Sequence, residues 1–198
     1  MIGRGGRFNA SAFSPDGHLI GGAARSGVAT LFDATSGDVV HTLRGHAKGV
    51  TGIAFSSDGR LVVTSSLDDD ARIWDVATGR VTEVLHGNYG PVSAASFSPN
   101  GRWVVTAGPA SAGIWDVSSG DPIVFLRGHT GPLTAASFSP DGTRVLTASL
   151  DGTVRVYTCE ACGNFDQLVG AAAARMAALS SRLTPAQRAR FVPVSGGA

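Results

Sequence analysis

A five-residue motif returns at nearly constant spacing along most of the chain. The pattern Phe-Ser-(Pro/Ser)-(Asp/Asn)-Gly occupies residues 13–17, 55–59, 97–101 and 138–142, at intervals of 42, 42 and 41 residues. A fixed period of about 40 residues is the signature of a repeat architecture, in which each unit buries its apolar faces against its neighbours. This periodicity therefore restricts the fold more than any single motif does.

Each period is divided by turns that leave room for four short strands. After the motif comes a β-rich run, and after a second turn comes an aromatic residue, which is Phe32, Trp74, Trp115 or Tyr157. Proline presets φ, Asp or Asn bonds its own backbone, and glycine accepts positive φ, so the motif suits a tight turn. Helices of the usual ~11 residues do not fit between these turns. The sequence therefore predicts antiparallel β-structure in four-stranded units.

These residues resemble the WD40 repeat. The resemblance rests on the period, on the Ser-Pro-Asp-Gly turns, and on the pairs Gly45-His46, Gly128-His129, Trp74-Asp75 and Trp115-Asp116. It implies β-propeller blades over residues 1–158. We therefore predict an all-β fold of four four-stranded antiparallel blades, with the last blade incomplete, in an open or partial propeller. A short α-helical tail is predicted for residues 159–198.

The connectivity predicts a hydrogen bond between two residues that are far apart in the sequence. If consecutive strands a to d run antiparallel, the d–a connection with His46 and the b–c turn with Asp68 share one edge of the blade, and His46 can donate to Asp68. In the family that the chain resembles, a strand-b Ser/Thr and the strand-c tryptophan complete a hydrogen-bonded tetrad. Carried over by position, the tetrad is His46, Thr64, Asp68 and Trp74 in blade two, and His129, Thr147, Asp151 and Tyr157 in blade four.

The run Asp68-Asp69-Asp70 also allows other interpretations. A calcium site needs about six or more oxygen ligands from a loop that glycine bends, and no glycine follows these acids directly. A catalytic carboxylate would need a nucleophile or a base beside it. We therefore favour a structural Asp68 followed by an exposed turn, and we expect no metal site, no cofactor and no catalytic residue.

Blades one and three lack parts of the tetrad. Asn88 replaces the histidine in blade three, and the b–c turn of that blade has no aspartate. Blade one has Gly22, Ser26 and Phe32 at the tetrad positions. We expect apolar packing alone to stabilise these two blades.

The first and last blades leave flat faces uncovered. No strand d precedes the first strand a, and none follows strand c of blade four, so these faces and an unpaired strand edge need a partner. The chain is either the carboxyl-terminal part of a longer propeller or one of two copies that pair into a larger ring. We favour the first explanation because the missing strand is the one expected directly before the first strand a, where the sequence begins.

Beyond residue 158 the apolar spacing becomes helical. Steps of three and four residues predict a helix over about 164–180, and Thr184-Pro185-Ala186-Gln187 is a capping box for a second, short helix. Cys159 and Cys162 fit packed small residues, which we favour, a reversible disulfide or half of a zinc site. This segment looks like the carboxyl end of bacterial WD40 regions on large signalling ATPases or kinases.

The composition argues against two classes of partner. The formal net charge is +1 and 16% of the residues are charged, which gives no attraction to nucleic acid or to an anionic membrane. No apolar run approaches the ~20 residues that span a bilayer. The first ten residues lack the apolar core of a signal peptide. We therefore expect a cytoplasmic protein.

The sequence predicts a non-enzymatic scaffold that presents propeller loops to a protein partner. Aromatic residues and arginine are frequent in interface hot spots. The loops on the same edge of the blades as His46 offer Arg25, Lys48, Leu67, Tyr89, Pro109 and Leu150. The alternative is a carboxyl-terminal sensor or regulatory fragment of a larger bacterial signalling ATPase or kinase, although the chain has no phosphate loop or kinase signature. The uncovered blade faces also offer a route to self-association.

Overall fold

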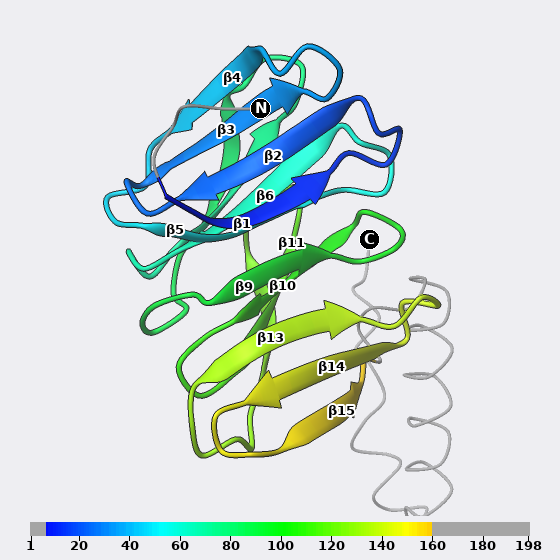
Figure 1. The fold of residues 1–198 in the computed structure, drawn as a ribbon. Helices are drawn as coiled ribbons and strands as arrows, with labels where there is room; N and C mark the ends of the chain where they lie inside the picture. The colour runs from blue at the N-terminus through cyan, green and yellow to red at the C-terminus, as the bar shows by residue number, and fades with distance from the viewer. Residues whose placement is uncertain (1–6, 160–198) are drawn as a thin grey trace, which may run out of the picture. The chain divides into compact units, whose positions relative to one another are not determined.

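The computed structural model describes residues 7–159, which Figure 1 shows as four sheets. Fifteen strands form this part of the chain, and no helix occurs in it. The chain divides into two compact units, Met1–Cys162 and Gly163–Ala198, and all described residues belong to the first. The helices expected over 164–180 and after Thr184 lie outside the described residues. The domain boundary at residue 158 stays a prediction.

Each sheet is one blade, built from strands that are consecutive in the chain. Blade one contains β1 (Phe8–Phe13), β2 (Leu19–Ala24), β3 (Val28–Asp33) and β4 (Val39–Arg44); blade two contains β5 (Val50–Phe55), β6 (Leu61–Ser66), β7 (Ala71–Asp75) and β8 (Val81–Leu85); blade three contains β9 (Ala94–Phe97), β10 (Trp103–Ala107), β11 (Ala112–Asp116) and β12 (Pro122–Leu126); blade four contains β13 (Leu133–Phe138), β14 (Arg144–Ser149) and β15 (Val154–Thr158). All pairings are antiparallel. The prediction of an open all-β array is confirmed, and among residues 7–159 the last blade has three strands, as expected.

The recurrent motif forms the turn between the first two strands of each blade. In blade one, Gly17 N–H donates to the Ser14 carbonyl at 2.9 Å, and Leu19 N–H donates to Ser14 Oγ at 2.8 Å. The motif's glycine has a φ between 70° and 75° in all four copies. Residues with a side chain rarely adopt this conformation, whereas glycine adopts it without steric cost. The turn geometry therefore explains why the glycine returns with the period.

The core lies between consecutive blades. The innermost strands β1, β5, β9 and β13 lie side by side, and an apolar cluster fills each of the three spaces between blades. Val62 belongs to the cluster of Trp74, between blades one and two, whereas Val63 belongs to the cluster of Trp115, between blades two and three. Successive side chains of a strand point to opposite faces. A blade that is covered on both faces therefore needs consecutive apolar residues in its second strand.

Side-chain hydrogen bonds also join the innermost strands. In three of these bonds, at equivalent positions of the repeat, a polar side chain of one blade donates to a backbone carbonyl of the next blade. These bonds, which we call inner clamps, are Asn9 Nδ2 to Val50 O (2.7 Å), Thr51 Oγ1 to Val92 O (2.6 Å) and Ser93 Oγ to Leu133 O (2.6 Å). Each net hydrogen bond contributes about 0.5–1.5 kcal/mol, so the clamps add to the apolar packing that holds each blade against its neighbour.

Candidate functional site

Four side chains of blade two form a hydrogen-bonded chain where the β4–β5 connection meets the β6–β7 turn. We call this side of the blades, with the connections and turns that share it, the His46 edge. Trp74 Nε1 donates to Thr64 Oγ1 at 2.8 Å, and Thr64 Oγ1 lies 2.8 Å from His46 Nε2. His46 Nδ1 lies 3.0 Å from Asp68 Oδ2, which also accepts from Ala47 N–H at 2.8 Å. The structure thus brings together all four residues that the sequence assigns to the blade-two tetrad.

The hydrogen-bond order makes His46 a neutral imidazole with its proton on Nδ1. Thr64 Oγ1 accepts from Trp74, and for its own proton His46 Nε2 at 2.8 Å is a nearer acceptor than the Arg72 carbonyl at 3.5 Å. We therefore assign the His46 proton to Nδ1, which donates to Asp68. Burial lowers the pKa of His46 from its usual 6.5, although Asp68 opposes this effect. Burial also disfavours the charged form of Asp68, but the hydrogen bonds from Ala47 and His46 outweigh it and keep the pKa of Asp68 below 3.8. Both shifts favour a neutral imidazole beside an ionised carboxylate.

We expect His46→Asn to weaken the dependence of stability on pH. Because the pKa of His46 is lowered in the folded chain, the unfolded chain takes up this proton first, near its unperturbed pKa of about 6.5. The contribution of His46 to stability is therefore complete above that pH and decreases as the pH falls toward the folded pKa. Urea unfolding at two pH values, about 7.5 and 5.5, should show a difference between wild type and variant of up to about 1.4 kcal/mol.

The control for this pH experiment is His18→Asn, on an exposed a–b turn. This variant should keep the wild-type loss of stability between the two pH values. If His46→Asn also keeps the full wild-type loss, the assignment of His46 as a buried neutral imidazole is wrong.

Blade four repeats three members of the network. His129 Nδ1 lies 2.9 Å from Asp151 Oδ2, and His129 Nε2 lies 2.8 Å from Thr147 Oγ1. The Thr153 hydroxyl donates to Asp151 Oδ1 at 2.7 Å, and Thr130 N–H donates to Oδ2 at 3.0 Å. The bond from Thr153, together with those from Thr130 and His129, holds the pKa of Asp151 far below its usual range.

The prediction that Tyr157 completes the blade-four tetrad is wrong. The Tyr157 hydroxyl donates to the Arg127 carbonyl at 3.1 Å, not to Thr147. The phenol oxygen sits at the tip of its ring, whereas the indole N–H of tryptophan sits at the side. The tyrosine hydroxyl therefore extends past the threonine and reaches the backbone beyond it.

The expectation that apolar packing alone stabilises blade three is also wrong. Thr106 Oγ1 donates to Asn88 Oδ1 at 2.5 Å, and Trp115 Nε1 donates to Thr106 Oγ1 at 2.8 Å. Asn88 is 3% exposed, and its Nδ2 donates to the Leu85 carbonyl at 3.1 Å. The amide oxygen thus accepts where the imidazole nitrogen accepts in blade two. Because the amide N–H uses a backbone carbonyl, blade three needs no aspartate.

Blade one uses apolar contacts at the same place, as the sequence predicts. Gly22 stands where blade two has Thr64, and a Cβ on Gly22 would lie 2.7 Å from the Phe8 ring. Phe8 packs edge to face against Phe32, with ring centroids 6.1 Å apart. The Phe8 ring therefore occupies the space that a threonine side chain fills in the other blades.

The three adjacent acids have three different surroundings. Asp68 belongs to the tetrad, and Asp69 is an exposed turn residue with a positive φ of 77°. The side chain of Asp70 is only 18% exposed and lies 2.8 Å from His86 Nδ1 and 4.0 Å from Arg72 Nη2. The prediction of an exposed turn is therefore wrong for Asp70. Among residues 7–159, no three His, Cys, Asp or Glu side chains gather closely enough to hold a metal ion.

Backbone hydrogen bonds fix the first residue of the b–c turn in three blades. The backbone N–H groups of Arg25, Leu67 and Leu150 donate to the carbonyls of Arg7 (3.0 Å), Gly49 (3.0 Å) and Pro132 (2.9 Å). Pro109 has no N–H and cannot make this bond. The side chains stay accessible, with Leu67 at 45% and Leu150 at 73% exposure. Four candidate contact residues thus recur at one position along the His46 edge.

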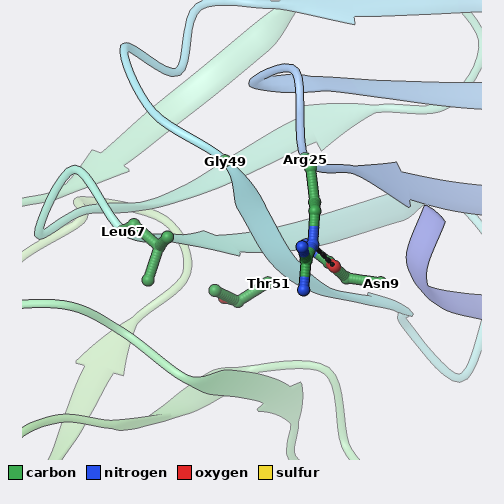
Figure 2. A pocket seen from close by; sticks show the side chains of 5 residues that line it. All are labelled: Asn9, Arg25, Gly49, Thr51 and Leu67. Atoms are coloured by element: carbon green, nitrogen blue, oxygen red, sulfur yellow. Dashed lines mark hydrogen bonds between the residues drawn. The ribbon is translucent and has the colours of Figure 1, made fainter. Parts of the chain in front are cut away.

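Two adjoining hollows lie along this edge. The first, of about 410 Å³, is drawn in Figure 2 and is lined by Asn9, Arg25, Gly49, Thr51 and Leu67. Arg25 Nε donates to Asn9 Oδ1 at 3.0 Å, which holds the guanidinium beside this hollow. The second hollow, of about 330 Å³, shares Thr51 and Leu67 with the first and extends to Pro91, Ser93, Gly108, Pro109, Pro132 and Leu133. Side chains of several blades therefore meet in one groove.

The other candidate contact residues do not line this groove. Tyr89 is 79% exposed and packs edge to face against Phe125, and with Pro109 it lines a third hollow of about 340 Å³. Lys48 and Leu150 are exposed but line none of these three hollows. Sequence reasoning missed Asn9 and Thr51, which line the first hollow. The sequence does contain a signal for them: both are polar residues at the same place in the first strand of consecutive repeats, one period apart.

The cysteine pair is only partly described. Cys159 is 5% exposed and belongs to the apolar cluster between blades three and four. It is also disulfide-bonded, so the interpretation of simple packing is incomplete. Cys162 lies outside the described residues. Among residues 7–159, no helix is long and apolar enough to cross a membrane.

Comparison with known proteins identifies the repeats. The family model for the WD domain, G-beta repeat, matches residues 37–75, 79–116 and 120–158, which together exceed half of the 198 residues. Each match begins before the last strand of one blade and ends with the third strand of the next, and β1 to β3 precede the first match. The comparison with curated proteins finds no match. With the period, the four sheets and the hydrogen-bonded tetrad in place, the chain belongs to the WD40-repeat family.

Proposed function

We propose that this protein is a non-enzymatic scaffold whose His46 edge binds a protein partner. WD40 repeats in general mediate protein–protein interaction. The observation that carries the proposal is the groove formed by the two adjoining hollows, because side chains of several blades line it together. A rigid array of blades holds these side chains in fixed positions, which reduces the entropy lost on binding.

The lining of the groove favours a partner segment with an acidic residue next to an apolar one. The first hollow has the fixed guanidinium of Arg25 and no carboxylate in its lining. Arginine binds carboxylates through two parallel hydrogen bonds. The lining of the second hollow is mostly apolar and includes Leu67, Leu133 and three prolines. An apolar side chain that enters this hollow would lose water-exposed surface, at about 25 cal/mol per Å².

The buried carboxylates support a structural role rather than acid–base catalysis. Asp68 and Asp151 each accept hydrogen bonds from a histidine and from a backbone N–H. Their lowered pKa values keep them ionised, so neither holds a proton to give to a substrate. Neither residue lines the groove.

Photo-crosslinking with the full chain tests the proposal. Leu67 is replaced by benzoylphenylalanine, and the chain is irradiated in an extract of its source cells. We expect one discrete crosslinked product, and Arg25→Glu in the same chain should reduce its yield at least about tenfold, because hot-spot charges contribute more than about 1.4 kcal/mol.

The matched control carries the same probe at Val81, on the outer strand β8. Val81 is 42% exposed, close to the 45% of Leu67, but it lies outside the groove. Identical products from both positions, or a Leu67 product that survives Arg25→Glu unchanged, would contradict the proposal. The alternative role as a regulatory part of a larger signalling ATPase or kinase stays a prediction, as does the cytoplasmic location.

A further inference from the structure

The open face of blade four repeats the buried face of an interior blade. Three residues of blade four correspond, in the repeat, to Val63, Ala71 and Ile73 of blade two. In blade two these three positions are 0% exposed because blade three covers them. The blade-four residues are Leu146, Val154 and Val156, which are 44%, 64% and 60% exposed. Blade four therefore presents an apolar surface with the pattern that elsewhere receives the next blade.

Blade four also keeps the polar groups of a blade-to-blade contact. In blade three, Ser93 Oγ donates to Leu133 O at 2.6 Å, and Ser96 Oγ donates to Ala136 O at 3.1 Å. The residues one period later in blade four are Thr134 and Ser137, and both are exposed. Thr134 makes only a 3.4 Å contact within its own blade, and Ser137 makes no side-chain hydrogen bond within residues 7–159. Two hydroxyls are thus placed for the carbonyls of a following blade.

The open face of blade one has the complementary pattern. Three residues of blade two pack against blade one: Val50, Phe55 and Val62. Their counterparts in blade one, one period earlier, are Phe8, Phe13 and Ile20. Phe13 is 67% exposed and Phe8 is 37% exposed. At these positions the two open faces of this chain resemble the two sides of an interior interface.

We propose that two copies of this chain associate head to tail, with blade four of one copy against blade one of the other. The interface between blades one and two indicates the contacts. There, a Cβ on Gly21 would lie 3.3 Å from the Phe55 ring. In the repeat, Leu146 of blade four corresponds to Gly21 of blade one, and Phe13 of blade one corresponds to Phe55 of blade two. Phe13 of the second copy therefore lies on Leu146, and Thr134 donates to the Phe8 carbonyl of the second copy.

A second contact of the same kind between the two free ends would close the pair into a ring. A head-to-tail contact uses two different surfaces, and it forms a ring when the rotation closes. Two copies have eight blades, within the range of about 4–8 found in propellers. The sequence favours a longer chain as the source of the missing blades, but the match between the faces of this chain makes the second copy the occupant that we propose. This interface does not involve the groove on the His46 edge.

Sedimentation velocity of the full 198-residue chain tests the association. We expect a species of twice the chain mass that increases with concentration. Phe13→Glu and Leu146→Glu each place a charge in the contact, and each should weaken pairing at least about tenfold. Both residues are exposed in the single chain, so the fold should persist. Val81→Glu, on an outer strand, is the matched control and should pair as the wild type does.

Mixing the two variants tests the direction of the contact. Phe13→Glu leaves the blade-four face intact, and Leu146→Glu leaves the blade-one face intact, so an equimolar mixture should recover paired species that neither variant forms alone. A chain that stays at single mass up to about 100 μM, variants that pair as well as wild type, or a mixture without recovery would overturn the proposal.

Discussion

Thr64→Val should lower the free energy of unfolding by about 2–5 kcal/mol, because it leaves two buried polar groups without partners. Thr64 is 0% exposed, accepts from Trp74 Nε1 at 2.8 Å and lies 2.8 Å from His46 Nε2. Valine has nearly the same shape, so little of the loss comes from a cavity. The loss arises because the indole N–H and the imidazole nitrogen are buried and lose the hydroxyl as their hydrogen-bond partner. Urea unfolding followed by tryptophan fluorescence measures it.

An exposed threonine provides the control for Thr64→Val. Thr78 Oγ1 donates to Asp75 Oδ1 at 2.7 Å on an exposed turn. Thr78→Val also removes one hydroxyl, but water replaces its hydrogen bond, and the loss should stay within about 1 kcal/mol. Equal losses for the two variants would show that the tetrad does not stabilise blade two.

Trp115→Ala should destabilise the protein by about 3–5 kcal/mol, which approaches the whole stability of an ordinary domain. Trp115 is 0% exposed in the cluster between blades two and three and packs edge to face against Phe125 at 5.7 Å. Its N–H is the donor to Thr106. The alanine variant therefore loses apolar burial, an aromatic contact and a hydrogen bond. Thermal unfolding followed by circular dichroism should show a large decrease in the melting temperature.

Tyr157→Ala is the comparison for Trp115→Ala. Tyr157 holds the equivalent place in blade four but is only half-buried, and its hydroxyl bonds a backbone carbonyl rather than the threonine. We expect less than half the destabilisation of Trp115→Ala. If Tyr157→Ala destabilised the protein by more than half as much as Trp115→Ala, the tyrosine would stabilise blade four mainly through its hydrogen bond and not through burial.

The sequence predicted the blades well because their period and turn chemistry are local. The glycine of each a–b turn and the consecutive apolar residues of each second strand need only neighbouring residues to be interpreted. The His46 to Asp68 contact followed from connectivity, since antiparallel strands place alternate loops on one edge.

The errors came from geometry that residue types do not encode. An asparagine at position 88 forms the same bond to Thr106 that a histidine forms elsewhere, because an amide oxygen and an imidazole nitrogen accept equally well. Tyr157 was assigned by aromatic character, although the place of its polar atom decides which partner it reaches. Asp70 was assigned to an exposed turn. Its pairing with His86 arises because β8 ends at Leu85 and so brings His86 beside the turn.

The inner clamps place unequal demands on the two strands that they join. The donor must be a short polar side chain at one position, such as Asn9, Thr51 or Ser93, but the acceptor is a main-chain oxygen. Any residue supplies that oxygen, so the receiving strand needs no matching substitution. A gene duplication that inserts one whole repeat would therefore create its own attachment at both junctions, and the array can gain members one at a time without a compensating change elsewhere.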